Sequence, residues 1–375
     1  MSRYKVLVYT PLELSQSSYF LTGLFMLAEE GKLQIEVKQD FKLKKGRLIV
    51  ADHKVKKVNK PFPKAAYFKL IDIKNQTSIS FATDTYDFDN QFSAYALKHC
   101  DFVFKRNYLQ KNIDFLPLNK RAKMYKMGLT FKVYSDLFRK NKTLQLGFLI
   151  VNLKADFKID RHSLSRLYKS FKKHKKQIKL LKNARLIEQY NKVKKGDENI
   201  VFFQTRCFSE EYHEDVRRIH EQRYHIIKLL KKEFPKYFRG GFIPSKIVNN
   251  RFADAITDVP TEAHAYLEAL KNAKIVIYTR GLANSPAWKM AEYLSQGKVI
   301  IAERLTTNLP FELEHGKHLL FFQNDQELIE NISLVLNNLD LAEKLSRNAR
   351  LYYENYVHPR ENAKRILELM TPTKL

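Results

Sequence analysis

The sequence predicts an α/β protein of two Rossmann-like, doubly wound domains that face each other across a cleft. The chain has 375 residues, and a typical domain has roughly 150. Its composition, 44% hydrophobic and 29% charged, is sufficient for packed cores and argues against a disordered chain. Short apolar runs alternate with helical patterns along both halves, which indicates mostly parallel sheets.

The first half opens with a short buried strand pattern at residues 4–9, followed by a loop rich in Ser and Gln. An apolar helix pattern then covers residues 19–30 and ends at Gly31. Further elements follow in alternation. The expected strands are 33–37, 47–51, 65–73, 78–82 and 101–105, and the expected helix is 90–99.

The middle of the chain is strongly basic. Residues 161–195 hold 13 Lys or Arg and one acidic residue, Glu188, within a chain whose net charge is +27. Apolar residues recur at the three-four spacing of a helix, so we expect one long helix with an apolar stripe on one face and almost only lysines on the opposite face. The stripe comprises Leu164, Leu167, Tyr168, Phe171, Ile178 and Leu181.

Three interpretations of this Lys-rich helix stay open. It is a solvated amphipathic helix that packs on the protein through its apolar stripe, a surface that docks on anionic lipid headgroups, or a nucleic-acid-binding element. Specific nucleic-acid recognition is not expected, although any polyanion should bind in a salt-dependent manner.

The alternation restarts after Gly196. Ser285 is a suitable N-cap for a helix at 286–296, Pro286 fits its first position and Gly297 fits its C-terminal end. The expected strands are 199–204, 237–243, 274–279, 298–302 and 318–322, and the expected helices are 215–234, 261–272, 286–296, 325–337 and 341–353.

These patterns give the predicted domain boundaries. Residues 1–155 form an N-terminal Rossmann-like domain, and 156–197 a Lys-rich helical connection. Residues 198–358 form a C-terminal Rossmann-like domain, and 359–375 a terminal helix and tail.

Several classes of protein are excluded. The two cysteines cannot form a disulfide scaffold or a four-cysteine zinc site. The N-terminus has no signal-peptide pattern, and its longest uncharged run is too short and too polar to cross a membrane. No G-x-G-x-x-G follows the first strand, which argues against a dinucleotide oxidoreductase.

The most informative stretch is 272–322. A strand ends at Arg280-Gly281, and a helix then carries Lys289 and Glu292 before the sequence Gly297-Lys-Val-Ile. This resembles the donor segment of GT-B glycosyltransferases of the group-1, family 4-like type, in which a helix with a carboxylate leads to a glycine and a short Val-Ile strand. The resemblance covers roughly 199–360 and is weak over 1–150.

The resemblance implies a donor site. The family's E-x7-E motif has its second glutamate at Glu292, where it would hold ribose hydroxyls, and its first place falls on Asn284. A diphosphate would be bound by basic residues after the strands. The implied donor ligands besides Glu292 are Arg206, with Arg223 as second choice, Arg280, Ser285 and Lys289.

The N-terminal half supplies the remaining candidates. An inverting enzyme of this architecture needs a base, for which Asp84 and His99 are candidates. Ser15, Ser17 and Ser18 follow the first strand and are candidate acceptor ligands, with an ordinary helix N-cap as the alternative. Asp84 also starts an acidic turn with a D-x-D match, but we expect no metal and no cofactor beyond the nucleotide sugar substrate.

By implication, the chain is a metal-independent glycosyltransferase. It would move a sugar from a nucleotide diphosphate sugar to a saccharide or glycolipid acceptor in cell-surface polysaccharide or lipopolysaccharide synthesis. We expect it in the cytoplasm, peripheral to the inner face of the cell membrane. The alternatives are a sugar-nucleotide epimerase of the same architecture and a basic, non-catalytic protein that binds membrane or nucleic acid.

Overall fold

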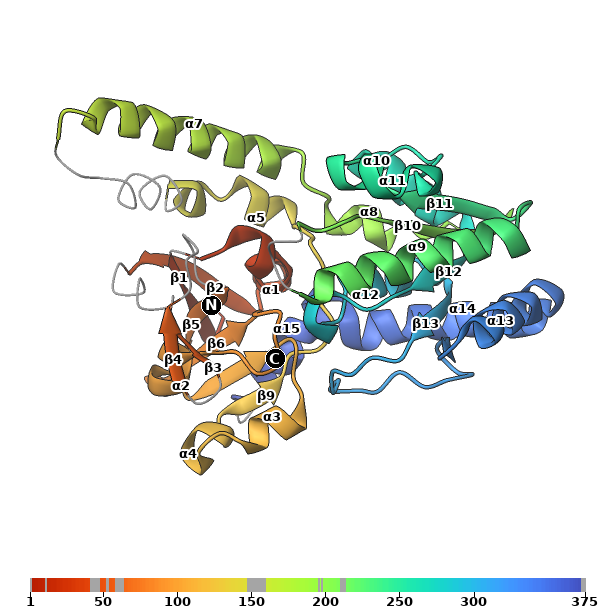
Figure 1. The fold of residues 1–375 in the computed structure, drawn as a ribbon. Coiled ribbons are helices and arrows are strands. Elements are labelled where there is room, and N and C mark those ends of the chain that lie inside the picture. Colours follow the sequence, from red (N-terminus) through yellow and green to blue (C-terminus); the bar gives the residue numbers. More distant parts are fainter. Residues whose placement is uncertain are drawn as a thin grey trace. The chain divides into compact units, whose positions relative to one another are not determined.

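The computed structural model describes residues 2–10, 12–40, 48–51, 54–57, 64–146, 160–194, 196, 198–209 and 214–371 (Figure 1). The chain forms two compact units. The first comprises Met1–Ile187 together with Pro359–Leu375, and the second comprises Glu188–His358. The prediction of two α/β domains is confirmed. The C-terminal segment 359–375 returns to the first unit, and most of the Lys-rich segment lies there too.

The first unit is built on a six-stranded sheet of order β2-β1-β5-β6-β8-β9. Its strands are β1 (Tyr4–Thr10), β2 (Leu33–Gln39), β5 (Ala65–Asp72), β6 (Thr77–Asp84), β8 (Phe102–Lys105) and β9 (Met124–Lys126). A separate three-stranded sheet of order β4-β3-β7 contains β3 (Leu48–Ala51), β4 (Lys54–Lys57) and β7 (Phe92–Ser93).

The large sheet is mixed rather than wholly parallel, because β5 runs antiparallel to both β1 and β6. Only residues 73–76 join β5 to β6, which is too short for the crossover that parallel neighbours require. The connection is a tight turn in which the Asp72 carboxylate accepts the amides of Lys74 and Asn75.

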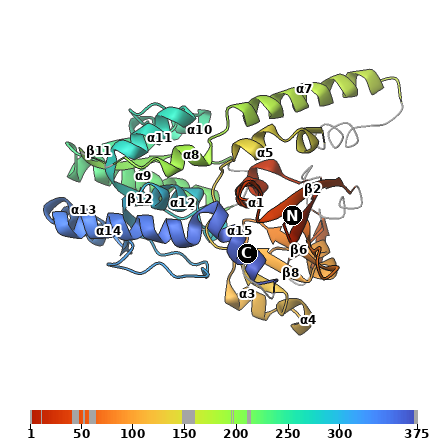
Figure 2. The ribbon, with the colours of Figure 1, turned by 180° about the vertical axis from the view of Figure 1, so that it is seen from behind.

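Helix α1 (Leu14–Glu29) packs against α15 (Pro359–Glu368) in the same unit (Figure 2). A Cβ at Gly23 of α1 would lie 2.1 Å from the carbonyl oxygen of Pro359, so only glycine permits this close approach. Phe20 of α1 packs on Phe68 and Phe81 of the sheet, with ring centroids 5.1 and 6.0 Å away. Other helices of this unit include α2 (Ala94–His99), α3 (Gln110–Asp114), α4 (Leu118–Arg121), α5 (Asp136–Lys140) and α7 (Ser163–Lys182).

The long helix expected over 161–195 is interrupted. Helix α7 ends at Lys182, and a second short helix, α8 (Ile187–Asn191), follows. The break lies where the chain pairs with Tyr134: the Tyr134 amide donates to the carbonyl of Arg185, and the Ile187 amide donates to the carbonyl of Tyr134. This pairing takes backbone groups that a continuous helix would have used.

The second unit has a five-stranded, wholly parallel sheet of order β11-β10-β12-β13-β14. Its strands are β10 (Glu198–Thr205), β11 (Phe238–Phe242), β12 (Ala273–Tyr278), β13 (Val299–Glu303) and β14 (Leu320–Phe322). Its longer helices are α9 (Asp215–Glu233), α11 (Ala263–Asn272), α12 (Trp288–Ser295), α13 (Asp325–Asn337) and α14 (Leu339–Tyr352), with α10 (Lys246–Arg251) after β11.

The apolar strand runs of the second unit form its buried core, which α9, α13 and α14 also line. Gly240 and Gly241 lie inside β11, with φ of 128° and 137°. A Cβ at Gly240 would lie 2.3 Å from the carbonyl oxygen of Phe203 on β10. The glycine pair therefore permits close packing of β11 on β10, within the strand predicted over 237–243.

Candidate functional site

The parallel sheet of the second unit changes winding direction between β10 and β12. The chain continues from β10 to β11 on one side, and from β12 through β13 to β14 on the other. In open α/β sheets, ligands bind outside the carboxyl ends of the strands at such a point. The residues that follow these two strand ends are Arg206 after β10, and Thr279 and Arg280 after β12.

Arg223 on α9 joins these two strand ends. Its guanidinium donates to the carbonyls of Arg206 and Arg280 at 3.0 and 3.2 Å, and its Nε lies 3.4 Å from the Thr279 hydroxyl. The side chain is 5% exposed, and burial lowers the pKa of Arg223 to about 10. Arg223 is predicted to bind a diphosphate, but in the structure its guanidinium binds backbone carbonyls. It thereby positions the loops that follow β10 and β12.

Arg280 is held by a carboxylate. Its two terminal nitrogens donate to the Asp215 carboxylate at 2.6 and 2.8 Å, and Asp215 lies in the first turn of α9. The hydrogen bond to Asp215 raises the pKa of Arg280 above its usual value. The Arg280 amide donates to Glu303 at the end of β13. To bind a phosphate, the Arg280 side chain would have to exchange its partner.

Arg206 differs from both, because its side chain is exposed and forms no ion pair with any described residue. Its guanidinium lies 5.6 Å from the ring centroid of Phe208, and the buried Arg223 lies 5.2 Å from the same ring. An exposed arginine at the end of β10 matches the predicted position of a diphosphate ligand.

The loop between β12 and α12 has an unusual backbone. Ala283 and Asn284 adopt φ of 52° and 56°, a left-handed conformation that is costly for residues other than glycine and is frequent at functional sites. The prediction of Ser285 as N-cap is wrong: α12 begins at Trp288, and its N-cap is Ala287, whose amide donates to the Tyr278 hydroxyl. Ser285 is buried within the preceding turn.

Lys289 and Glu292 both lie on α12, as the sequence predicts. The Lys289 ammonium lies 5.6 Å from the ring centroid of Tyr266. Glu292 is 6% exposed, and its two carboxylate oxygens accept hydrogen bonds from the hydroxyls of Tyr190 and Tyr266 at 3.4 and 3.2 Å. A carboxylate in this setting is oriented by the two tyrosines, which the sequence does not reveal.

Two carboxylates that the sequence analysis missed also lie at this edge. Glu303 ends β13 and accepts from the amide of Arg280 and from the side chain of Gln222. Asp215 accepts from Arg280 and from the amide of Ala283, 68 residues away in sequence. Their positions at a strand end and a helix start are the signals that could have identified them.

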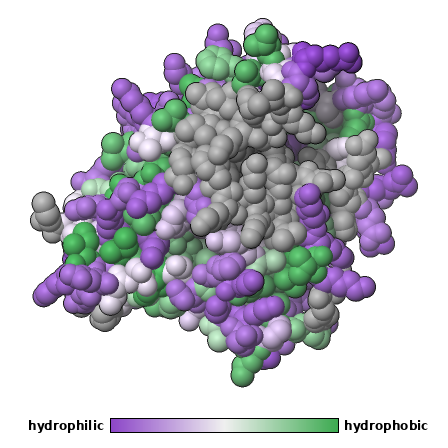
Figure 3. Space-filling view, turned by 90° about the vertical axis from the view of Figure 1, so that its left-hand side faces the viewer, coloured by the Kyte–Doolittle hydropathy of each residue, from purple (hydrophilic) through white to green (hydrophobic). Residues whose placement is uncertain are grey.

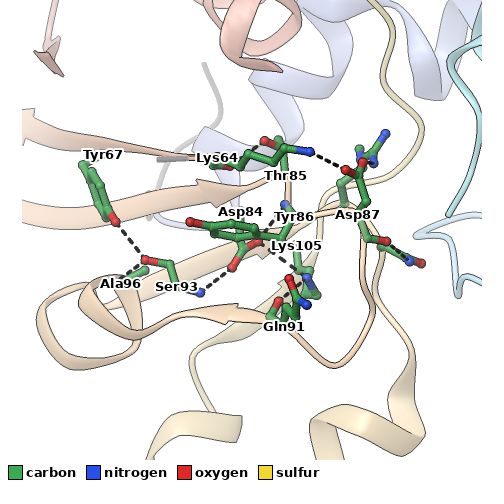
Figure 4. A network of polar contacts seen from close by, with 12 residues as sticks. Lys64, Tyr67, Asp84, Thr85, Tyr86, Asp87, Gln91, Ser93, Ala96 and Lys105 are labelled. Carbon is green, nitrogen blue, oxygen red and sulfur yellow. Dashed lines mark hydrogen bonds and ion pairs between the residues drawn. The ribbon is translucent and has the colours of Figure 1, made fainter. Parts of the chain in front are cut away.

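Asp84 is at the centre of a buried polar network in the first unit (Figure 4). Both Asp84 and Lys105 are 0% exposed, and the Lys105 ammonium lies 3.5 Å from the Asp84 carboxylate. The carboxylate also accepts the amides of Tyr86 and Ser93 at 3.1 and 2.8 Å. This burial and ion pair do not fit the predicted role of Asp84 as a catalytic base, which requires a carboxylate that a substrate can reach.

His99 is exposed and lies near the amino ends of the parallel strands β6 and β8, whereas Asp84 lies at their carboxyl ends. His99 ends α2, just before β8. Its ring packs on Tyr95 with centroids 4.4 Å apart. The structure does not bring the two candidate bases together.

The serines after β1 belong to α1 rather than to a loop. The N-cap of α1 is Glu13, without a side-chain capping bond, so the alternative of a serine N-cap is wrong. Ser17 and Ser18 are buried, and the Ser18 hydroxyl donates to the carbonyl of Ser15. The Ser15 hydroxyl donates to Glu13. Ser15 is thus the one of the three candidates that is not buried.

Two negative findings apply to the described residues. Within them, no group of three or more His, Cys, Asp or Glu side chains is arranged to hold a metal ion. No helix in the same ranges combines the length and the apolar character that a membrane span requires.

Comparison with known proteins concerns mainly the second unit. Residues 223–368 match a protein family described as "Glycosyl transferase-like". This match confirms the resemblance of the C-terminal half to glycosyltransferases. No curated protein matches the sequence.

Solved structures with a similar fold include TarM, with 16% identity over 48% of this chain and 36% of that chain, and a TM-score of 0.32. A glycosyltransferase from Rickettsia africae matches with 12% identity over 74% of this chain and 64% of its own (TM-score 0.39). A UDP-GlcNAc 2-epimerase from Neisseria meningitidis matches with 15% identity over 74% and 63% (TM-score 0.36). The chain spans less than two thirds of the length of each of these proteins.

Proposed function

We propose that this protein is a glycosyltransferase whose C-terminal unit binds a nucleotide diphosphate sugar at the carboxyl edge of its parallel sheet. The observation that carries the proposal is the exposed Arg206 at the point where the winding of the sheet reverses, in the unit that contains most of the residues, 223–368, that match a glycosyl transferase-like family. The planar guanidinium suits the oxygens of a diphosphate.

In this proposal the charge of the departing nucleoside diphosphate is neutralised by protein cations, without a metal. Arg206 contacts the diphosphate directly, and Arg223 keeps the ends of β10 and β12 in register through the carbonyls it binds. Arg280 joins the site when the diphosphate competes with Asp215 for its guanidinium. Preorganised cations of this kind stabilise the charge that develops on the leaving group.

The finer parts of the proposal concern the acceptor and the location. We place the acceptor, a saccharide or glycolipid of cell-surface polysaccharide or lipopolysaccharide synthesis, on the N-terminal unit, with Ser15 as a candidate ligand. The net charge of +27 supports a site of action beside an anionic surface. We therefore propose a peripheral association with the cytoplasmic face of the cell membrane.

The test of the donor site is a titration of UDP, GDP and ADP by isothermal calorimetry, followed by a transfer assay with labelled nucleotide sugars. We expect one nucleotide to bind, and Arg206→Ala to weaken it by about tenfold or more, as expected for loss of a charged hydrogen bond. The matched control is Arg347→Ala on α14, an exposed arginine whose neighbour Ser346 donates to the carbonyl of Gly297, just before the amino end of β13.

Equal effects of both substitutions would refute the role of Arg206. Failure of all three nucleotides to bind would refute the proposed function. Conversion of the free nucleotide sugar into its epimer, without transfer, would identify the epimerase alternative.

A second candidate, a non-catalytic binding protein, is favoured by one observation. The predicted ribose ligand Glu292 is buried against two tyrosine hydroxyls, and Arg280 is paired with Asp215. Binding of a nucleoside diphosphate without any transfer to saccharide or glycolipid acceptors would support this candidate.

A further inference from the structure

Helix α7 (Ser163–Lys182) concentrates positive charge. Its 20 residues include seven Lys, one Arg and no acidic residue. In Figures 1 and 2 it lies beside α5, within the first unit. A helix with this charge attracts an anionic partner over a range set by ionic strength.

The same helix exposes large apolar side chains. Leu164, Tyr168 and Phe171 are 82%, 70% and 58% exposed. Their spacing of four and then three residues places them on one side of the helix, over its first turns. We define these three side chains as the apolar strip of α7. Figure 3, which views the left-hand side of Figure 1, shows single hydrophobic groups scattered among hydrophilic ones on that side of the molecule.

A different face of α7 attaches it to the protein. Ser170 and Leu181 are buried, at 1% and 4% exposure. Ser170 lies six residues after Leu164, so at about 100° per residue it is turned roughly 120° around the helix from Leu164. The expectation that Leu164, Tyr168 and Phe171 pack on the protein is therefore wrong. The helix has one anchored face and, separately, an apolar strip that faces outward.

Lysines flank the strip. Lys172 and Lys175 are exposed and follow Tyr168 and Phe171 by four residues each, which places each on the same side of the helix one turn further on. Apolar side chains bordered by lysines on a helix surface are the pattern of a helix that lies in the interface of an anionic bilayer.

We propose that α7 docks on an anionic lipid bilayer, with the apolar strip in the headgroup–acyl boundary and Lys172 and Lys175 on the headgroup phosphates. The docking of α7 rests on the proposed function only for its biological purpose, because a glycosyltransferase on the bilayer is held near a glycolipid acceptor. The contacts of α7 are independent of the donor site.

Lipid fits these residues better than nucleic acid does. Leu164 is the most exposed of the three and cannot stack on a base, whereas it gains by leaving water for the acyl boundary. The helix uses lysine rather than the arginine that suits bidentate phosphate and base contacts. Nucleic-acid binding is accordingly an outcome of the test.

The first unit offers a natural control surface. Phe115 and Leu118, beside α3 and α4, are 58% and 75% exposed, and Lys111, Lys120 and Arg121 lie nearby in the sequence. Asp114 lies among them, with a carboxylate oxygen 3.7 Å from Arg121. This surface has similar apolar exposure but a mixed charge, so it separates the effect of α7 from that of apolar exposure in general.

The experiment is co-sedimentation of the full chain with phosphatidylcholine vesicles, with and without phosphatidylglycerol, and with no nucleotide or sugar present. We expect binding only with phosphatidylglycerol, weakened by added salt. Leu164→Ser/Tyr168→Ser/Phe171→Ser and Lys172→Glu/Lys175→Glu should each lower the partition coefficient by about tenfold or more. Phe115→Ser/Leu118→Ser should change it by less than about twofold.

All substituted side chains in the two test variants are exposed, and circular dichroism checks that each variant is folded. Three outcomes would overturn the proposal. The control variant could lower the partition coefficient as much as the test variants do, or vesicle binding could be the same with and without phosphatidylglycerol. The third outcome is tight binding of RNA without binding to vesicles. Because no nucleotide is present, the two proposals are tested separately. Vesicle binding can be absent in a protein that binds a nucleotide, and nucleotide binding can be absent in a protein that binds vesicles.

Discussion

Replacing Asp84 should destabilise the first unit far more than replacing a surface aspartate. In the wild type, the Asp84 carboxylate accepts two backbone amides and faces the Lys105 ammonium, and both side chains are 0% exposed. Lys105 keeps a hydrogen bond of 2.8 Å to the Gln91 carbonyl. That neutral acceptor cannot compensate for the lost charge.

The magnitude follows from these contacts. Removing one partner of a buried ion pair costs about 3–5 kcal/mol, and each amide left without an acceptor costs about 1–3 kcal/mol. Proton loss from Lys105 limits the total, because burial already lowers the pKa of this lysine. We therefore expect Asp84→Ala to reduce the free energy of unfolding by about 4–6 kcal/mol at neutral pH.

The pH dependence has a defined sign. With the Lys105 pKa depressed in the folded state, the unfolded chain binds more protons between that pKa and the usual value of 10.5. Stability therefore rises with pH across this window. The cost of Asp84→Ala should shrink as the pH rises, because a neutral Lys105 no longer needs its partner.

Urea unfolding with two signals measures the effect. Trp288, the single tryptophan, is in the second unit, so its fluorescence follows that unit, while far-UV circular dichroism follows both. Asp84→Ala should move the dichroism transition and leave the fluorescence transition in place. The control is Asp136→Asn, whose carboxylate is 40% exposed in its ion pairs and should cost no more than about 1 kcal/mol.

Similar costs for the Asp84 and Asp136 variants, or a cost for Asp84→Ala that does not change between neutral and alkaline pH, would refute this account of the network. The double variant Asp84→Asn/Lys105→Met provides a further check. It should be more stable than either single variant, since no unpaired charge is left buried.

Two further predictions concern the second unit. Burial lowers the pKa of Lys298 to about 8, and its ammonium donates to the Lys271 carbonyl at 2.6 Å. The free energy of unfolding should therefore rise between about pH 8 and 10.5 by up to ~3 kcal/mol in the wild type, and Lys298→Met should remove this rise in a Trp288 fluorescence titration. Glu292→Gln should lower stability by about 1–3 kcal/mol, because two tyrosine hydroxyls lose a charged acceptor. Calorimetric unfolding equal to that of the wild type would exclude this role for Glu292.

The second unit was the more predictable half. Helix α9, predicted over 215–234, spans Asp215–Glu233, and β12, predicted over 274–279, spans Ala273–Tyr278. Continuous apolar runs mark strands that are buried on both faces, and the three-four spacing marks the helices that cover them. The position of Arg206 at the end of β10 follows directly from that alternation.

The site could be predicted as a set of positions but not as a set of interactions. Asp215 pairs with Arg280 across 65 residues of sequence, and Arg223 binds the carbonyls of two loops that belong to different strands. The sequence shows which of these residues are basic and which are acidic. It does not show which cation forms an ion pair, because that depends on how the strand ends and α9 pack together. Only Arg206 kept the predicted character of an exposed cation.

The sequence by itself determined the local elements and their α/β alternation, because hydrophobic periodicity and the short reach of backbone hydrogen bonds act over a few residues. Tertiary structure decided which side of α7 is anchored, that β5 runs antiparallel, and that Asp84 is buried against Lys105. Those outcomes depend on packing partners that are distant in the chain. An amphipathic helix or an aspartate at a strand end is compatible with a buried or an exposed position, and only its neighbours in space decide between the two.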